Sequence, residues 1–220
     1  MDAIVLLLKI LLVNIVLSGD NAVVIAMASR NLPPAQRKKA VWWGAAGAVG
    51  LRLVLTVAAV ILLDVPLIQA IGSLLLIYIA IKLLVEDESH GKVVQAASLM
   101  SAVWTIIVAD FVMSLDNVLA IAAIAKGNFW LIVLGIGISI PLIVWGSTLI
   151  MKLLNKYPIL IYLGAGILGY TAGEMFVGDE KMKKWLFEES ETLHYLIPVI
   201  GVIIVIGAGL LKKLKWFRII

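Results

Sequence analysis

Long apolar runs, separated by short polar and charged segments, dominate this chain. Seven of them reach roughly the 17 to 25 residues that a helix needs to cross the hydrocarbon core of a bilayer. They lie at residues 4–28, 41–63, 67–85, 97–125, 129–154, 159–177 and 195–211. The pattern predicts an all-α membrane protein with seven transmembrane helices, forming a single transmembrane domain over residues 1–215.

Composition agrees with this class. The chain is 63% hydrophobic and 15% charged, with a mean hydropathy of +1.10, far outside the range of a water-soluble domain. No cleavable signal peptide is expected, because the first run is too long and follows Asp2. Cysteine is absent, which excludes disulfides, thiolate metal sites and cysteine catalysis.

Basic residues between the runs predict the orientation. Eleven fall on one side of the membrane: Arg30, Arg37, Lys38, Lys39, Lys92, Lys152, Lys156, Lys212, Lys213, Lys215 and Arg218. Four fall on the other: Lys126, Lys181, Lys183 and Lys184. Because Lys and Arg are enriched in cytoplasmic loops, we expect a multi-pass protein of the cell membrane with its N-terminus outside and its C-terminus in the cytoplasm. The net charge of +4 therefore reports topology, and no nucleic-acid partner is predicted.

The chain also contains an internal repeat. Pro66, Gly72 and Tyr78 match Pro158, Gly164 and Tyr170 at a constant offset of 92. Residues 4–88 and 97–180 would each hold three crossings, so the second unit enters the membrane from the opposite face. Two inverted three-helix repeats are a transporter architecture. The seventh helix, residues 195–211, has no counterpart and is expected to be an additional packing helix.

Acidic residues occur inside these runs, in a motif that appears twice. The carboxylates are Asp20, Asp110, Asp116 and Glu174. Ser18-Gly19-Asp20-Asn21 recurs as Ser114-Leu115-Asp116-Asn117, and Asn14 stands where the second copy has Asp110. An acid in hydrocarbon is costly, so such a residue is a functional candidate. The duplication suggests an ion site, whereas the structural alternative is that these side chains join helices through hydrogen bonds.

The motif residues form one polar stripe in each half. Asp110, Ser114 and Asn117 stand at i, i+4 and i+7, as do Asn14, Ser18 and Asn21. The two stripes are expected to face each other. On a regular helix Asp20 and Asp116 would point about 120° away from their stripes. We therefore expect local unwinding that turns these carboxylates inward, near Gly19 in the first half.

The ligands on offer are oxygen atoms, which suit hard cations such as Mn²⁺, Mg²⁺ or Ca²⁺. Three acids around one divalent ion leave excess negative charge, which proton binding or a basic neighbour would offset; proton coupling is therefore plausible. Arg52 is either that counter-ion or a partner of backbone carbonyls. Glu174 is either an exit-path ligand or an interfacial acid.

The double motif resembles the hallmark of the TerC family of integral membrane proteins, and the resemblance extends over about residues 1 to 215. It implies manganese efflux across the cytoplasmic membrane, with some members associated with tellurite resistance. By motif match the metal ligands would be Asp20, Asn21, Asp110, Asp116 and Asn117. Secondary candidates are Asn14, Ser18, Ser114, Arg52 and Glu174. Asn14 departs from the acid of the second repeat, which alters the charge of the first half-site.

The leading hypothesis is a secondary transporter that exports Mn²⁺ through an acidic site between the first and fourth helices. In that case Mn²⁺ is substrate, there is no permanent cofactor, and the partners are the metal ion and the bilayer. Alternatives are transport of Ca²⁺ or another divalent ion, a membrane scaffold that delivers metal, and, remotely, an intramembrane aspartyl protease built on Asp20 and Asp116. The chain is not expected to be an enzyme. The oligomeric state does not follow from the sequence.

Overall fold

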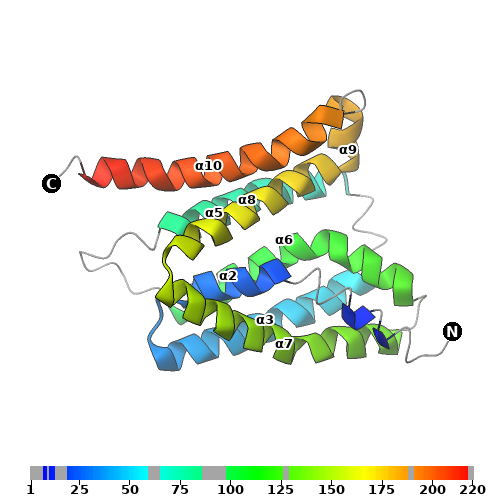
Figure 1. The fold of residues 1–220 in the computed structure, drawn as a ribbon. Helices are drawn as coiled ribbons and strands as arrows, with labels where there is room; N and C mark the ends of the chain where they lie inside the picture. The colour runs from blue at the N-terminus through cyan, green and yellow to red at the C-terminus, as the bar shows by residue number, and fades with distance from the viewer. Residues whose placement is uncertain are drawn as a thin grey trace. The chain divides into compact units, whose positions relative to one another are not determined.

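The computed structural model describes residues 7–8, 10–12, 19–58, 65–85, 98–125, 129–187 and 191–217. Within these ranges the regular structure is helical throughout (Figure 1). The helices are α2 (Gly19–Ser29), α3 (Pro34–Val57), α5 (Ile68–Val85), α6 (Leu99–Ala125), α7 (Phe129–Lys156), α8 (Ile159–Gly178), α9 (Glu180–Met182), the π-helix η1 (Lys183–Phe187) and α10 (Glu191–Phe217).

A substantial helix covers or overlaps each of the seven predicted runs. Several extend further than the apolar pattern, because a helix can continue into its polar flank. α3 begins at Pro34 instead of residue 41, with proline in the first turn, where it has no amide hydrogen to leave unpaired. Four described helices are long and apolar enough to cross a membrane: Ile68–Val85, Trp130–Lys156, Ile159–Gly178 and Thr192–Leu211. The protein is thus an all-helical, multi-pass membrane protein.

Contacts divide the chain into two compact units, residues 1–64 with 97–153 and residues 65–96 with 154–220. Each unit takes helices from both predicted repeats: the first contains α2, α3, α6 and most of α7, and the second contains α5, α8, α9, η1 and α10. The inverted repeat itself stays a prediction.

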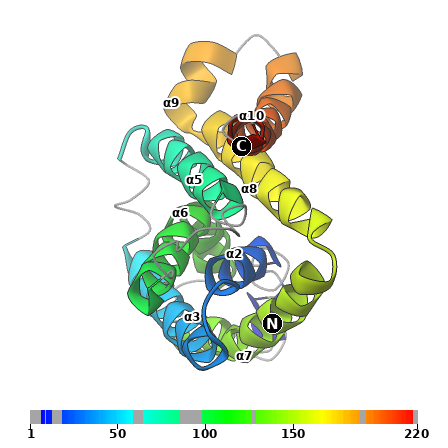
Figure 2. The ribbon, with the colours of Figure 1, turned by 90° about the vertical axis from the view of Figure 1, so that its left-hand side faces the viewer.

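In the first unit α3 packs along α6, and α2 contacts both (Figure 2). Glycines on α3 allow the close approach: a Cβ at Gly44 would lie 2.7 Å from Ile106 Cδ1, and one at Gly47 would lie 2.6 Å from Ile107 Cδ1. The α2–α3 turn is held by Arg37, whose Nη2 donates to the carbonyl oxygens of Arg30 at 2.7 Å and Leu32 at 3.1 Å.

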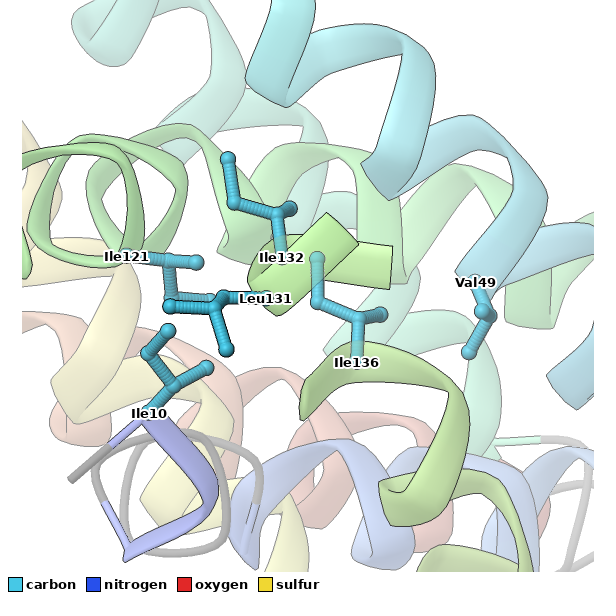
Figure 3. Close-up of a cluster of buried hydrophobic side chains, with 6 residues drawn as sticks. All are labelled: Ile10, Val49, Ile121, Leu131, Ile132 and Ile136. Atoms are coloured by element: carbon cyan, nitrogen blue, oxygen red, sulfur yellow. The ribbon is translucent and has the colours of Figure 1, made fainter. Parts of the chain in front are cut away.

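An apolar cluster attaches α7 to the rest of this unit. Its buried members are Ile10, Val49, Ile121, Leu131, Ile132 and Ile136 (Figure 3). They come from the helical turn near residue 10 and from α3, α6 and α7. In lipid such side chains hold helices together through close van der Waals packing, because lipid tails are as apolar as the side chains themselves. This cluster therefore fixes α7 beside the helices that carry the motif.

In the second unit α8 packs against both α5 and α10. The backbones of α8 and α10 touch at small residues, where a Cβ at Gly169 would lie 2.7 Å from the carbonyl oxygen of Gly201. Gly173 meets the backbone of Pro198 in the same way. Small residues that let backbones meet are the usual basis of helix association in lipid. α10, the predicted additional helix, is therefore packed on α8.

The buried carboxylate of Asp179 lies between the end of α8 and the start of α9. Asp179 Oδ1 accepts hydrogen bonds from the backbone nitrogens of Lys181 at 3.0 Å and Met182 at 3.1 Å. Its Oδ2 accepts from the backbone nitrogen of Ala70 at 3.3 Å. These donors lie in the first turns of α9 and α5, so a single side chain caps two helices.

Candidate functional site

The polar stripe of the second half lies on α6 and is buried. Asp110, Ser114 and Asn117 are 7%, 0% and 7% exposed. α6 runs without a break from Leu99 to Ala125, so the unwinding expected for this half is wrong. Asp110, Ser114 and Asn117 stand at i, i+4 and i+7, so the regular helix carries all three on one face.

Asp110 forms a buried ion pair with Arg52 of α3. Arg52 Nη2 lies 2.6 Å from Asp110 Oδ1. Arg52 Nε donates to Ser114 Oγ at 2.9 Å, and that hydroxyl donates to Asp110 Oδ2 at 3.2 Å. Of the two roles considered for Arg52, the geometry therefore shows pairing with an acid of the motif. The three side chains form a closed triangle between α3 and α6.

α2 supplies Asp20 and Asn21 of the first motif copy. Asp20 is partly buried, and its Oδ1 accepts a hydrogen bond from the backbone nitrogen of Asn21 at 2.9 Å. α2 contacts α6, the helix that carries Asp110 and Asn117. The structure thus brings together parts of both motif copies, as the sequence predicts for helices one and four.

Asn21 differs from Asp20 and Asp110 in the hydrogen bonding of its side chain. It is 2% exposed, and neither its side-chain nitrogen nor its side-chain oxygen makes a hydrogen bond to a described residue. A buried polar group left unpaired costs about 1–3 kcal/mol.

The remaining predicted residues are placed differently. Asn14 and Ser18 lie outside the described residues, as does the side chain of Asp116. Glu174 belongs to the second unit, where it is exposed and lines a pocket of about 260 Å³ together with Lys183 and His194. Among the described side chains no three of His, Cys, Asp or Glu come close enough to hold a metal ion. The described part of the motif therefore offers two carboxylates, one amide without a partner and one guanidinium.

The sequence did not indicate the contribution of Ser114 to the ion pair, nor the pocket at Glu174. Ser114 was visible only as a member of the stripe; its contact with Arg52 joins residues 62 positions apart in the chain. His194 stands beside an apolar run, and only the fold shows that it lines the same pocket as Glu174.

Comparisons with known proteins agree with the motif. Residues 1–215 match the integral membrane protein TerC family. The chain is 44% identical to the uncharacterized membrane protein YjbE of Bacillus subtilis (strain 168) over 209 residues, covering 95% of each protein. It is 27% identical over 181 residues to the UPF0053 inner membrane protein YgdQ of Escherichia coli (strain K12), covering 73% of this chain and 76% of YgdQ. No solved structure gives a significant match. The chain belongs to the TerC family of integral membrane proteins.

Proposed function

We propose that this protein is a secondary transporter that exports divalent metal ions, with Mn²⁺ as the main substrate, through a site formed by the motif residues of α2 and α6. The observation that carries the proposal is the buried side-chain amide of Asn21, which has no hydrogen-bond partner among the described residues and belongs to the residue that follows Asp20 in the motif. A bound cation would give that amide oxygen a partner.

The types of ligand atom in the motif limit which metal ions the site would bind. Asp20, Asn21, Asp110 and Asn117 present carboxylate and amide oxygens, and Asp116 would add another carboxylate. Oxygen ligands suit Mn²⁺, Ca²⁺ and Mg²⁺ better than zinc or copper. The preference for Mn²⁺ and for export follows the family resemblance. No catalytic step and no resident cofactor are part of the proposal.

Helix pairing within each unit supports an inverted repeat. In the first unit α2 contacts α6, and in the second unit α5 contacts α8. These pairs join the first and the third helices of the two predicted repeats, as a pseudo-two-fold axis would. Rocking of one repeat against the other would then expose the site to each side in turn. In the proposed orientation the N-terminus is outside and the C-terminus is cytoplasmic.

Transport by the purified protein in liposomes tests the proposal. Uptake of Mn²⁺, Ca²⁺, Mg²⁺ and Zn²⁺ would be measured with a metal-sensitive dye inside the vesicles, with and without a pH gradient. We expect Mn²⁺ flux well above that of empty liposomes, and stimulation by the gradient if protons are the coupling ion. Mn²⁺ binding without flux of any of the four ions would favour the metal-delivery scaffold instead.

Substitutions of Asn21 test whether Mn²⁺ binds at this site. Asn21→Ala removes the amide oxygen and should weaken Mn²⁺ binding by about tenfold, or about 1.4 kcal/mol. Asn21→Asp retains an oxygen ligand and should bind more tightly than Asn21→Ala. Ser29→Ala is the matched control, because Ser29 lies buried in the same helix and its hydroxyl donates to carbonyl oxygens of that helix, to Ile25 at 2.6 Å and to Ala26 at 3.5 Å. Equal Mn²⁺ affinity in all four proteins would remove Asn21 from the site.

A further inference from the structure

Both carboxylate oxygens of Asp110 already have partners within the protein. Oδ1 pairs with the Arg52 guanidinium at 2.6 Å, and Oδ2 accepts from Ser114 at 3.2 Å. Ser114 in turn receives the Nε hydrogen of Arg52 at 2.9 Å. Each carboxylate oxygen of Asp110 therefore accepts a hydrogen bond from another side chain of the protein.

A metal ion bound to Asp110 would compete with that arrangement. Hard divalent ions bind carboxylate oxygens at about 2.0–2.6 Å. With Nη2 only 2.6 Å from Oδ1, an ion on the same oxygen would sit within a few ångströms of a full positive charge. Like charges at this separation, in a site where Arg52 is 1% exposed, repel strongly because little water screens them. This repulsion favours binding of one cation at a time.

We propose that Arg52 is a tethered cation that occupies Asp110 when the site holds no metal and is displaced when a divalent ion binds. This inference rests on the proposed function, and it gives Arg52 a defined part in it. The guanidinium sets how tightly metal is held, and its return to Asp110 drives release.

The residue type fits this role. Arginine stays protonated at every physiological pH, so it leaves the carboxylate by moving, not by losing a proton. Its planar fork also allows Nη2 to contact Asp110 while Nε contacts Ser114. A lysine ammonium, a single point charge, cannot reproduce the two contacts from two separate nitrogens.

Mn²⁺ affinity of the purified, full-length protein tests the proposal. Free Mn²⁺ would be followed by its electron paramagnetic resonance signal during titration of wild type, Arg52→Lys and Arg52→Ala. Removing or weakening the competitor should tighten binding, by about fivefold for Arg52→Lys and more for Arg52→Ala. Thr56→Ala is the control: Thr56 lies one turn further along α3 and bonds to the carbonyl oxygen of Arg52 at 2.7 Å, so its loss should leave Mn²⁺ affinity unchanged.

A second readout distinguishes competition from a purely structural role. Millimolar guanidinium should raise the apparent Kd for Mn²⁺ in Arg52→Ala without changing the number of sites, and should have no such effect in wild type. If Arg52→Ala does not fold, the charge-retaining Arg52→Lys still decides. Mn²⁺ affinity in Arg52→Lys equal to or weaker than wild type would overturn the tethered cation while leaving the transporter standing. No Mn²⁺ binding by the wild type would refute the proposed function itself.

Discussion

The buried ion pair makes a quantitative prediction about stability. Arg52→Met leaves the carboxylate of Asp110 buried without its counter-ion, and Asp110→Leu leaves the guanidinium of Arg52 in the same condition. Removing one partner of a buried pair typically costs about 3–5 kcal/mol. A Coulomb estimate of about 4 kcal/mol for charges about 4 Å apart at an effective dielectric constant of about 20 agrees with that range. We expect each single variant to lose at least about 3 kcal/mol of unfolding free energy.

The double variant Arg52→Met/Asp110→Leu contains neither charge, and two apolar side chains of similar size fill the space between α3 and α6. Its stability should be close to that of wild type, because replacing a buried pair by apolar residues is often neutral. Unfolding by sodium dodecyl sulfate in mixed micelles, followed by circular dichroism, would give all four free energies. A double variant destabilised by the sum of the two single losses would refute the pair as the cause.

The remaining predictions concern helix packing, capping and orientation. Gly201→Val should destabilise the protein by about 1–3 kcal/mol, because its Cβ would meet the carbonyl oxygen of Gly169, whereas Gly207→Val, on the same helix with no atom within 4 Å of its Cβ position, should have little effect on the melting temperature. Asp179→Ala removes the acceptor of three backbone hydrogen bonds and should cost about 1–3 kcal/mol, visible as faster amide exchange in the first turns of α5 and α9. A reporter fused after Ile220 should be active only in the cytoplasm; external activity would contradict the basic-residue asymmetry.

The sequence alone is sufficient to predict features that depend on residues close together in the chain. Pro33 and Pro34 mark the turn between α2 and α3, and Tyr157 with Pro158 marks the turn between α7 and α8, because proline lacks an amide hydrogen and restricts the residue before it. The apolar runs predict the helices for a similar reason: in lipid the backbone must satisfy its own hydrogen bonds. The motif spacing likewise predicts one buried stripe on α6.

Tertiary structure decided which residues become partners. Arg52 and Asp110 are 58 positions apart, and no spacing rule indicates that the close packing of α3 on α6 brings them to 2.6 Å. Only the structure shows that the Asn21 side chain on α2 is buried without a partner among the described residues, and that α6 is regular where unwinding was expected. Local sequence determines where helices form and which face is polar, because helical hydrogen bonds span four residues. The partner of each polar group depends on contacts between helices, which exist only once the chain has packed.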